Sequence, residues 1–300
     1  MNSPRLLILG RNGQVGWELQ RSLAPLGEIL ALDRHGDPGG NLEDPEGLRA
    51  TIRQWKPHVV VNAAAHTAVD RAESEADLAW RINAEAPGVL AHVAREVGAW
   101  LVHYSTDYVF DGSGERPWHE SDTPAPLGVY GKSKLAGENA ILASGARALI
   151  FRTSWVYAAR GQNFARTMLR LARERERLSV VADQFGAPTG AELIADVTAH
   201  AVRRALDNAV SPGIFHLAAS GTTSWFEYAR YVIDHARRHQ SALPFKVTAI
   251  DPVTTAEWPT PARRPLNSRL DTRHLEETLN LRLPPWQHGV SRMLEEILVS

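Results

Sequence analysis

The chain has 300 residues, of which 44% are hydrophobic and 22% are charged, and its formal net charge is −1. This length is enough for one large or two ordinary domains with a buried core. The chain contains no cysteine, which excludes disulfides, iron–sulfur clusters, cysteine-ligated zinc and a thiol nucleophile. A nearly neutral chain has no electrostatic field for gathering polyanions, so we expect no nucleic-acid partner.

The apolar runs of the chain are short. The longest, such as residues 6–9 and 59–61, end far below the length of a membrane span. The apolar segment near the first residue is also too short for a signal peptide. We therefore expect a cytoplasmic protein with no membrane partner.

The first half of the chain alternates short apolar runs with longer segments of helical period. Strands are predicted at residues 6–9, 29–32, 59–61, 100–103 and 149–151, and helices at 14–24, 45–55, 77–97 and 130–142. Strands that are apolar on both faces and separated by helices indicate a parallel sheet covered on both sides. The pattern predicts an α/β fold with a doubly wound parallel sheet of the Rossmann type. Ligands of such a sheet bind beyond the carboxyl ends of its strands.

The second half of the chain is less regular. Helices are predicted at residues 164–177, 191–206, 224–239 and 287–298, and proline-containing segments at 183–189 and 258–265 interrupt them. We expect residues 1–150 to form a cofactor-binding domain. Residues 151–300 are expected to form mainly a smaller, mixed α/β substrate-binding domain, with some segments returning to the first sheet.

A glycine-rich turn follows the first predicted strand. Gly10, Gly13 and Gly16 are spaced by three and open the next helix. Such glycines allow a tight turn, close approach of a pyrophosphate and packing of the helix on its strand, and the helix N-terminus offers free N–H groups to the anion. An ordinary strand-to-helix turn is the alternative, but the position after the first strand favours dinucleotide binding.

The second predicted strand ends at Asp33, where a carboxylate could receive the adenosine ribose hydroxyls. Asp33 favours NADH, whereas Arg34 and Arg11 could hold a 2′-phosphate and favour NADPH. We expect both cofactors to be accepted. The third strand leads into Ala63, Ala64 and Ala65, whose small side chains would let the chain run close to a cofactor, although they also suit ordinary close packing.

The region between residues 104 and 135 contains hydroxyl and amine groups that could take part in catalysis. Tyr130 and Lys134 are four residues apart, so on a helix they share one face. A nearby ammonium stabilises a phenolate and lowers its pKa, which would make Tyr130 a usable acid. Thr106, at the end of the fourth strand, could donate a hydrogen bond to the same substrate oxygen. Lysine is scarce, with only Lys56, Lys132, Lys134 and Lys246 in the chain. The Tyr130–Lys134 spacing is therefore less expected by chance, and this favours a functional role.

The ordered set of Gly10, Gly13, Gly16, Thr106, Tyr130 and Lys134 resembles the extended short-chain dehydrogenase/reductase family. Within it, residues 10–16, 62–70, 104–110, 152–157, 183–192 and 259–268 resemble the dTDP-4-dehydrorhamnose reductases, nearly throughout the chain. The resemblance implies reduction of the C4 ketone of dTDP-4-dehydro-L-rhamnose to dTDP-L-rhamnose with NADPH or NADH, for cell-surface polysaccharide such as the O-antigen of lipopolysaccharide. Related dehydratases carry Thr-Asp-Glu where this chain has Thr106-Asp107-Tyr108, so reduction is favoured over elimination.

The resemblance also implies site residues. Tyr130, Lys134 and Thr106 would be catalytic. Those expected to bind the cofactor are Gly10, Asn12, Gly13, Gln14, Val15, Gly16, Asp33, Arg34, Asn41, Leu42, Ala64, Ala65, His66, Thr67, Tyr104, Tyr130 and Lys134. Those expected to bind the dTDP-sugar are Thr106, Asp107, Trp155, Arg263 and Arg264, although core packing for Trp155 and a surface loop for the two arginines are open alternatives.

The sequence also bears on metal binding and on two alternative functions. The resemblance allows Mg²⁺ at Glu192, Glu295 and Glu296 in a homodimer, without showing that these carboxylates meet. His235 and His239 have the spacing of metal ligands, but the intervening arginines and the lack of a third ligand in the sequence favour a solvated helix end. Two other functions stay open, namely a non-catalytic, cofactor-binding regulatory subunit and a nucleotide-sugar epimerase.

Overall fold

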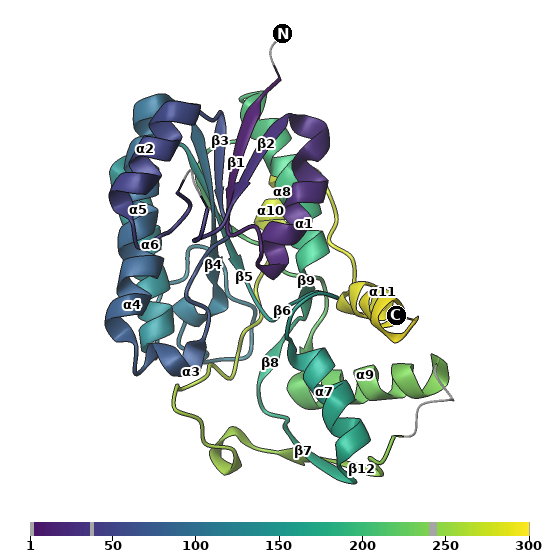
Figure 1. Cartoon of the computed structure of the whole chain (residues 1–300). Coiled ribbons are helices and arrows are strands. Elements are labelled where there is room, and N and C mark those ends of the chain that lie inside the picture. The colour runs from purple at the N-terminus through teal and green to yellow at the C-terminus, as the bar shows by residue number, and fades with distance from the viewer. Residues whose placement is uncertain (1–2, 37–38, 240–244, 300) are drawn as a thin grey trace.

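A six-stranded sheet forms the centre of the computed structural model, which describes residues 3–36, 39–239 and 245–299 (Figure 1). All its neighbouring strands run parallel, in the order β10-β5-β4-β3-β1-β2. The strands are β1 (Arg5–Leu9), β2 (Glu28–Leu32), β3 (Val59–Asn62), β4 (Trp100–Thr106), β5 (Ala148–Thr153) and β10 (Gly213–His216). The predicted doubly wound fold is confirmed. The strand order reverses between β1 and β3, which is where such sheets bind ligands.

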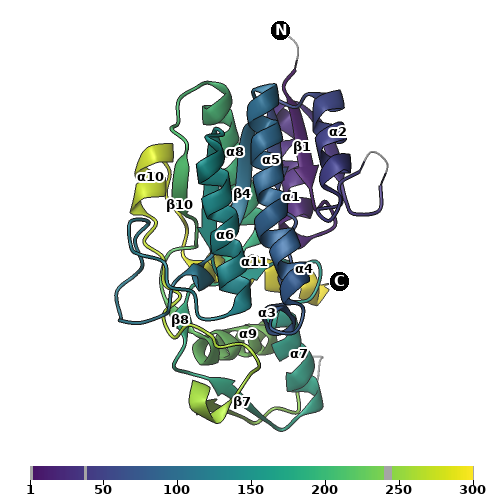
Figure 2. The same cartoon turned by 90° about the vertical axis from the view of Figure 1, so that its left-hand side faces the viewer.

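Helices cover both faces of this sheet because its strands are apolar on both faces. Along β1, Leu6 and Ile8 belong to one buried cluster, whereas Leu7 and Leu9 belong to another. On the first face lie α1 (Gln14–Leu23), α8 (Ala191–Leu206) and α10 (Arg273–Leu279), and on the second lie α2 (Pro45–Trp55), α5 (Ala86–Val97) and α6 (Val129–Ser144) (Figure 2). The second half of the chain thus supplies β10, α8 and α10 to the central sheet and its covering.

The helix predicted at residues 77–97 is divided in the structure. It consists of α4 (Ala76–Trp80), a π-helical turn at Arg81–Glu85 and α5, and the short α3 (Val69–Ala72) precedes it. Pro87 explains the division, because proline lacks an N–H group and its ring conflicts with the carbonyl group four residues earlier. That carbonyl belongs to Asn83, against which Gly137 of α6 packs so closely that a Cβ atom there would overlap it.

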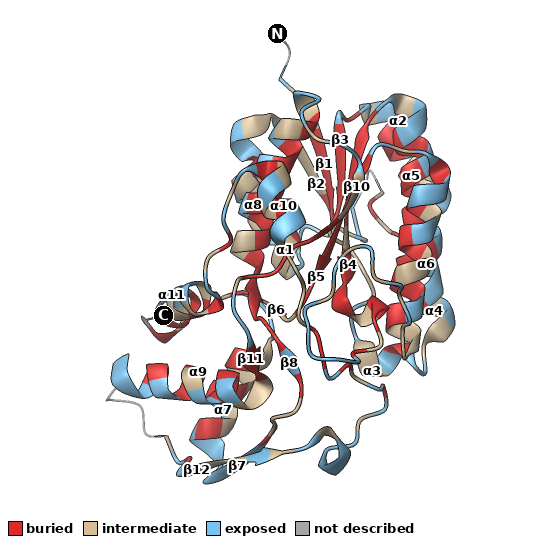
Figure 3. Cartoon of the chain, turned by 180° about the vertical axis from the view of Figure 1, so that it is seen from behind, coloured by how far each residue is buried: buried red, intermediate tan, exposed pale blue. Residues whose placement is uncertain are grey.

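A smaller unit below the sheet is built around a second apolar cluster. The helices α7 (Phe164–Glu174), α9 (Trp225–His239) and α11 (Trp286–Val299) enclose it. Three short strand pairs accompany them, namely β7 (Arg177–Val181) with β12 (Ala249–Val253), β6 (Val156–Tyr157) with β9 (Thr189–Gly190) and β8 (Phe185–Gly186) with β11 (Thr223–Ser224). Figure 3 shows buried residues along the central strands and within these helices, and exposed residues on the outer helix surfaces.

The helix predicted at residues 164–177 ends early. Arg175 is already extended, and Arg177 begins β7, which pairs with the distant β12. The remaining short elements are the 3-10 turns Ala24–Leu26, Asp107–Val109 and Thr255–Glu257. Among the described residues, we find no helix that combines the length and apolar character needed to cross a membrane.

Candidate active site

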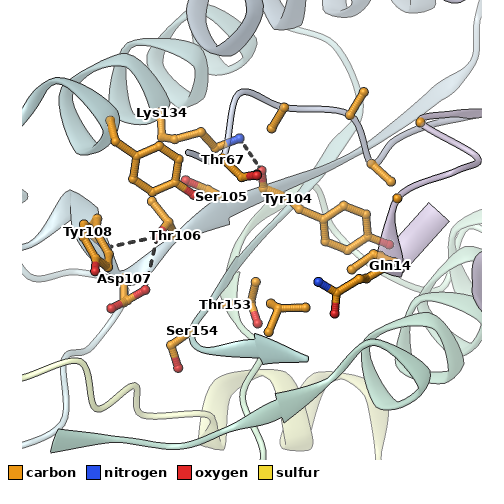
Figure 4. Close-up of a pocket in the computed structure, with 18 of the residues that line it drawn as sticks. Gln14, Thr67, Tyr104, Ser105, Thr106, Asp107, Tyr108, Lys134, Thr153 and Ser154 are labelled. Carbon is orange, nitrogen blue, oxygen red and sulfur yellow. Dashed lines mark hydrogen bonds between the residues drawn. The ribbon is translucent and has the colours of Figure 1, made fainter. Parts of the chain in front are cut away.

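Two adjoining cavities lie at the carboxyl ends of the central strands. The inner cavity, of about 560 Å³, is lined by the turn after β1 and the start of α1, by β3, β4 and α6, and by the end of β5 with the segment after it (Figure 4). The outer cavity, of about 360 Å³, lies toward the end of β2. Gly10, Gly13, Ala64 and Ala65 line both. They therefore form one elongated cleft at the point where the strand order reverses.

The glycine-rich turn is shaped by close backbone packing. Gly10 has a φ of +88°, and a Cβ atom there would lie 2.8 Å from the backbone nitrogen of Ala64. A Cβ atom on Gly16 would overlap the carbonyl oxygen of Gly10. Only glycine fits both positions, so the turn from β1 to α1 lies directly against the small residues after β3.

Predicted cofactor residues line both parts of the cleft. The inner cavity is lined by Gly10, Gly13, Gln14, Val15, Ala64, Ala65, Thr67, Tyr104, Tyr130 and Lys134. The outer cavity is lined by Asn12, Asp33, Arg34, Asn41 and Leu42 together with the shared residues. Gly16 and His66 line neither cavity. Gly16 packs α1 onto the turn, and His66 Nε2 lies 2.9 Å from a Glu75 carboxylate oxygen.

Charged groups of the outer cavity pair with one another. The Asp33 carboxylate accepts hydrogen bonds from Arg11 Nε at 3.0 Å and Asn12 Nδ2 at 2.7 Å. A hydrogen bond from the backbone N–H of His35, together with the Arg11 guanidinium, lowers the pKa of Asp33. Arg34 Nε donates to His35 Nε2. Asp33 and Arg11, the residues for which the sequence predicts opposite cofactor preferences, thus form a single ion pair.

Lys134 is buried at the wall of the inner cavity. Its Nζ donates to the carbonyl oxygen of Tyr104 at 2.6 Å, as Figure 4 shows, and lies 3.2 Å from His103 Nε2. Burial lowers the pKa of Lys134 to about 8, against the opposing effect of the Glu138 carboxylate. His103 Nδ1 in turn lies 3.1 Å from Asn62 Nδ2. A buried chain of polar groups therefore connects Asn62 of β3 to Lys134 of α6.

Tyr130 also lines the inner cavity, as does Thr106. Its ring makes an edge-to-face contact with Tyr108, with ring centres 5.5 Å apart. The sequence argument expects Lys134 to lower the pKa of Tyr130. In the structure, burial raises that pKa to about 12, and Lys134 Nζ faces the carbonyl oxygen of Tyr104 and His103 Nε2 instead of the Tyr130 hydroxyl.

Thr106 ends β4 and Asp107 begins the 3-10 turn that follows it, and both line the inner cavity. Thr106 Oγ1 donates to Asp107 Oδ1 at 3.1 Å and accepts from the backbone N–H of Tyr108 at 3.2 Å (Figure 4). Burial raises the pKa of Asp107 to about 6. Hydroxyl and carboxyl groups are thus held at the floor of the cavity, where a sugar could contact them.

Trp155 forms part of the cavity wall in an unusual backbone conformation. Its φ is +48°, which a non-glycine residue adopts only when its surroundings require it. Its ring stacks on that of Trp225 with centres 3.6 Å apart, and a Cβ atom on Gly186 would lie 2.8 Å from its indole. The structure therefore fixes Trp155 against the smaller unit while its indole stays at the cavity.

Arg263 and Arg264 line a different cavity, of about 660 Å³, between the 111–113 and 255–266 segments. Arg264 Nη2 donates to Asp70 Oδ2 at 2.8 Å, which ties this segment to α3. Arg263 is exposed. Arg264 is thus linked to the edge of the inner cavity, which Val69, the neighbour of Asp70, lines.

Sequence reasoning missed several polar residues of the site. His103 contacts Lys134, and Asn62 contacts His103. The hydroxyls of Ser105 and Thr153 are buried without hydrogen-bond partners in the part of the chain that the structure describes. Ser105 and Thr153 both line the inner cavity. Both residues follow predicted strands, and this could have identified them as site residues, because parallel strands end at the same edge of a sheet.

The carboxylates considered for a metal separate into two places. Glu192 and Glu296 line a cavity of about 230 Å³, where Glu192 lies 3.4 Å from Arg292. Glu295 does not line that cavity. Its carboxylate instead lies beside His235 and His239, with the ligand atoms of the three within 4.8 Å of one another. The sequence argument that His235 and His239 have no third ligand is therefore wrong, because α11 brings Glu295 to α9.

Comparisons with known proteins identify the family. The sequence model described as RmlD substrate binding domain matches residues 4–299. A dTDP-4-dehydrorhamnose reductase of Escherichia coli K12 is 55% identical over 296 residues, 98% of each chain. The crystal structure of a dTDP-4-dehydrorhamnose reductase from Clostridium acetobutylicum has a TM-score of 0.88 at 34% identity, covering 98% of this chain and 99% of that one.

A second solved structure, a dTDP-4-dehydrorhamnose reductase from Bacillus anthracis, is described as a complex with NADP. It has a TM-score of 0.87 at 35% identity, covering 99% of this chain and 100% of that one. The similarity thus extends over both the central sheet and the smaller unit. The chain belongs to the family of the dTDP-4-dehydrorhamnose reductases.

Proposed function

We propose that the protein reduces the C4 ketone of dTDP-4-dehydro-L-rhamnose to dTDP-L-rhamnose, with NADPH or NADH as the reductant. The observation that carries the proposal is the convergence of Thr106, Tyr130 and Lys134 on one cavity beside the glycine-rich turn. Full-length similarity to reductases of this name supports the substrate.

The cleft fits a nicotinamide dinucleotide. Gly10, Gly13 and the N-terminus of α1 would hold the pyrophosphate, and the outer cavity would hold the adenosine end beside Asp33. The nicotinamide would lie in the inner cavity, near Tyr104 and Lys134. When bound there, the reduced nicotinamide supplies the hydride.

The residues of the inner cavity would orient and protonate the sugar. The Tyr130 hydroxyl is placed to donate a hydrogen bond to the C4 oxygen, and Thr106 would donate to it in exchange for its hydrogen bond to Asp107. Burial keeps Tyr130 protonated, as its pKa of about 12 shows, and the alkoxide formed by reduction is a stronger base than a phenolate. Tyr130 can therefore give up its proton to the product oxygen. Lys134 would hold the ribose of the cofactor.

Replacing Tyr130 with Phe tests the proposal. We expect oxidation of NADPH in the presence of dTDP-4-dehydro-L-rhamnose to fall roughly a hundredfold or more, while NADPH binding, followed by fluorescence titration, stays nearly unchanged. Tyr228→Phe is the matched control, because Tyr228 lies in the core of the smaller unit and its hydroxyl has no hydrogen-bond partner among the described residues. Full turnover by Tyr130→Phe would refute the role of Tyr130.

The same assay separates the other two functions. A regulatory subunit would bind NADPH but oxidise none of it without a partner enzyme. An epimerase would purify with tightly held NAD and interconvert nucleotide sugars with no net oxidation. Repeating the assay with NADH and with a UDP-sugar measures the preferences for cofactor and nucleobase.

Three finer parts of the proposal rest on the family resemblance. The enzyme would be a cytoplasmic homodimer, and Mg²⁺ would bind near Glu192 and Glu296, which line one cavity. Light scattering with and without Mg²⁺ tests the dimer and its dependence on the ion together.

A further inference from the structure

A cluster of two histidines and a carboxylate lies outside the cleft, between α9 and α11. His235 and His239 are one helical turn apart on α9, and Glu295 is on α11, which packs against α9. The ligand atoms of the three side chains lie within 4.8 Å of one another. Figure 1 shows these two helices as neighbours in the smaller unit, away from the carboxyl ends of β1 and β3.

His235 carries a ring nitrogen without a hydrogen-bond partner. The residue is only 5% exposed, and its Nε2 is buried without a hydrogen-bond partner among residues 3–36, 39–239 and 245–299. Buried polar side-chain atoms are almost always hydrogen-bonded, so a buried nitrogen without a partner requires an explanation. A bound cation would supply the missing partner, because a neutral imidazole nitrogen is a common metal ligand.

His239 is oriented as metal-binding histidines usually are. Its Nδ1 lies 2.9 Å from the carbonyl oxygen of His235. A carbonyl oxygen can only accept, so Nδ1 must carry the proton, and Nε2 keeps its lone pair. A hydrogen bond from the second ring nitrogen to a carbonyl is the usual support of a metal-ligating histidine.

Enclosing an ion requires the three side chains to move closer together and a histidine ring to turn. Zn²⁺ binds imidazole nitrogen and carboxylate oxygen at about 2.0–2.2 Å, so tetrahedral ligand atoms lie roughly 3.3 Å apart. The two imidazole rings stack, with centres 4.1 Å apart and planes inclined by 15°, so one ring must turn before both nitrogen lone pairs, which lie in the ring planes, can point at one ion. Glu295 and His239 are both exposed, so their side chains are free to move the remaining ångström or so toward His235.

We propose that His235, His239 and Glu295 form a site for a divalent first-row transition cation, of which Zn²⁺ is the best match. Two imidazoles and one carboxylate give three protein ligands, and water from the exposed side completes four. The ion would fasten the C-terminal end of α9 to α11. It would take no part in the reduction, because the cluster is separate from the cavity that contains Tyr130.

Calorimetric titration of the full, tag-free protein with ZnCl₂ tests the site. We expect one equivalent to bind, and the thermal unfolding midpoint to rise with the free Zn²⁺ concentration, because an ion bound only to the folded state stabilises it. His239→Ala should weaken binding at least tenfold and remove the thermal shift. His200→Ala, which removes an exposed histidine of α8, should leave both unchanged.

A second pair of variants distinguishes this cluster from the neighbouring carboxylates. Glu295→Gln should weaken Zn²⁺ binding, whereas Glu296→Gln, which alters a residue of the cavity containing Glu192, should not. The proposal is overturned if the protein binds no Zn²⁺, if His239→Ala binds it as well as the unaltered protein, or if Glu296→Gln is the weaker binder of the two. NADPH oxidation by each variant verifies that it is folded.

Discussion

Lys134 is an amine whose burial lowers its pKa, and the polar groups around it bear on the same property. The amide oxygen of Asn62 accepts from the backbone N–H of Ala64, so its NH₂ group faces His103 Nδ1 and donates to it. A neutral His103 then carries its proton on Nε2, which points at Lys134 Nζ. A neutral amine can accept that proton in a hydrogen bond, whereas an ammonium cannot. The polar chain thus favours the neutral amine, as burial does, and both lower the pKa of Lys134.

A change in the pH dependence of stability should follow from replacing Lys134 with Met. The pKa of Lys134 is about 8 when folded and near the ordinary 10.5 when unfolded. Between these values the unfolded state binds more protons, so the free energy of unfolding contributed by Lys134 increases with pH. The full change is on the order of 3 kcal/mol. Denaturant unfolding across this window should show the increase in the unaltered protein and a flatter profile in Lys134→Met.

Lys132 provides the control for this experiment. It lies on the same helix but is exposed, so Lys132→Met should retain the pH profile of the unaltered protein. Equal slopes for Lys134→Met and the unaltered protein would mean that Lys134 stays charged throughout, and the argument from Asn62 and His103 would then be wrong.

At the scale of elements, the sequence predicts best what is encoded locally. The helix at Pro45–Trp55 and the helix at Ala191–Leu206 are predicted at their exact bounds, because each has an apolar face of helical period. The strands β7, β10 and β12 were not predicted. Each is short, and its existence depends on a partner strand far away in the chain, as β12 pairs with β7.

The same limit applies to the candidate site. The glycine spacing and the Tyr130–Lys134 spacing are local, so the sequence displays them. The contact of His103 with Lys134 and the approach of Glu295 to His235 depend on the packing of separate elements. No spacing along the chain encodes such contacts.

The close packing of α1 on its strand makes Gly16 sensitive to substitution. Gly16→Ala should reduce the free energy of unfolding by about 2 kcal/mol or more, because the added methyl group would overlap the carbonyl of Gly10. NADPH binding should weaken as well, since the start of α1 must shift. Denaturant unfolding and fluorescence titration measure the two effects.

Gly213 of β10 is the comparison for Gly16. The nearest atom to a Cβ there would be 3.7 Å away, an ordinary contact with Phe215. Gly213→Ala should therefore be neutral or slightly stabilising. If both substitutions cost the same, steric crowding at the turn is not what distinguishes Gly16.

At the scale of the whole molecule, Asp70 connects the two halves of the chain beside the cleft. Its carboxylate accepts hydrogen bonds from Arg264 and from the backbone N–H of Ala262. Asp70→Asn should change stability by less than about 1 kcal/mol, because the pair is partly exposed. The KM for the dTDP-sugar should nevertheless rise several-fold, since the 255–266 segment loses its anchor. Steady-state kinetics measure the effect.

Asp251 allows a matched comparison. It is 38% exposed, against 39% for Asp70, and pairs with Arg177 within the smaller unit. Asp251→Asn should leave the KM unchanged. A similar KM for the two variants would show that the link between Asp70 and Arg264 does not position the segment.

The division into domains at residue 150 stays a prediction. Segments beyond that residue also build the central sheet, so the sheet itself does not end there.

The position of β10 at the edge of that sheet has a consequence for biosynthesis. β5 ends at Thr153, but its outer neighbour begins only at Gly213. A ribosome adding roughly 5–20 residues per second needs on the order of 3 to 12 seconds to deliver the intervening stretch of about 60 residues. During that interval β5 is an open, apolar edge, the kind of surface through which nascent chains associate wrongly. Slow translation or truncation between residues 153 and 216 would therefore expose the sheet at its most vulnerable strand.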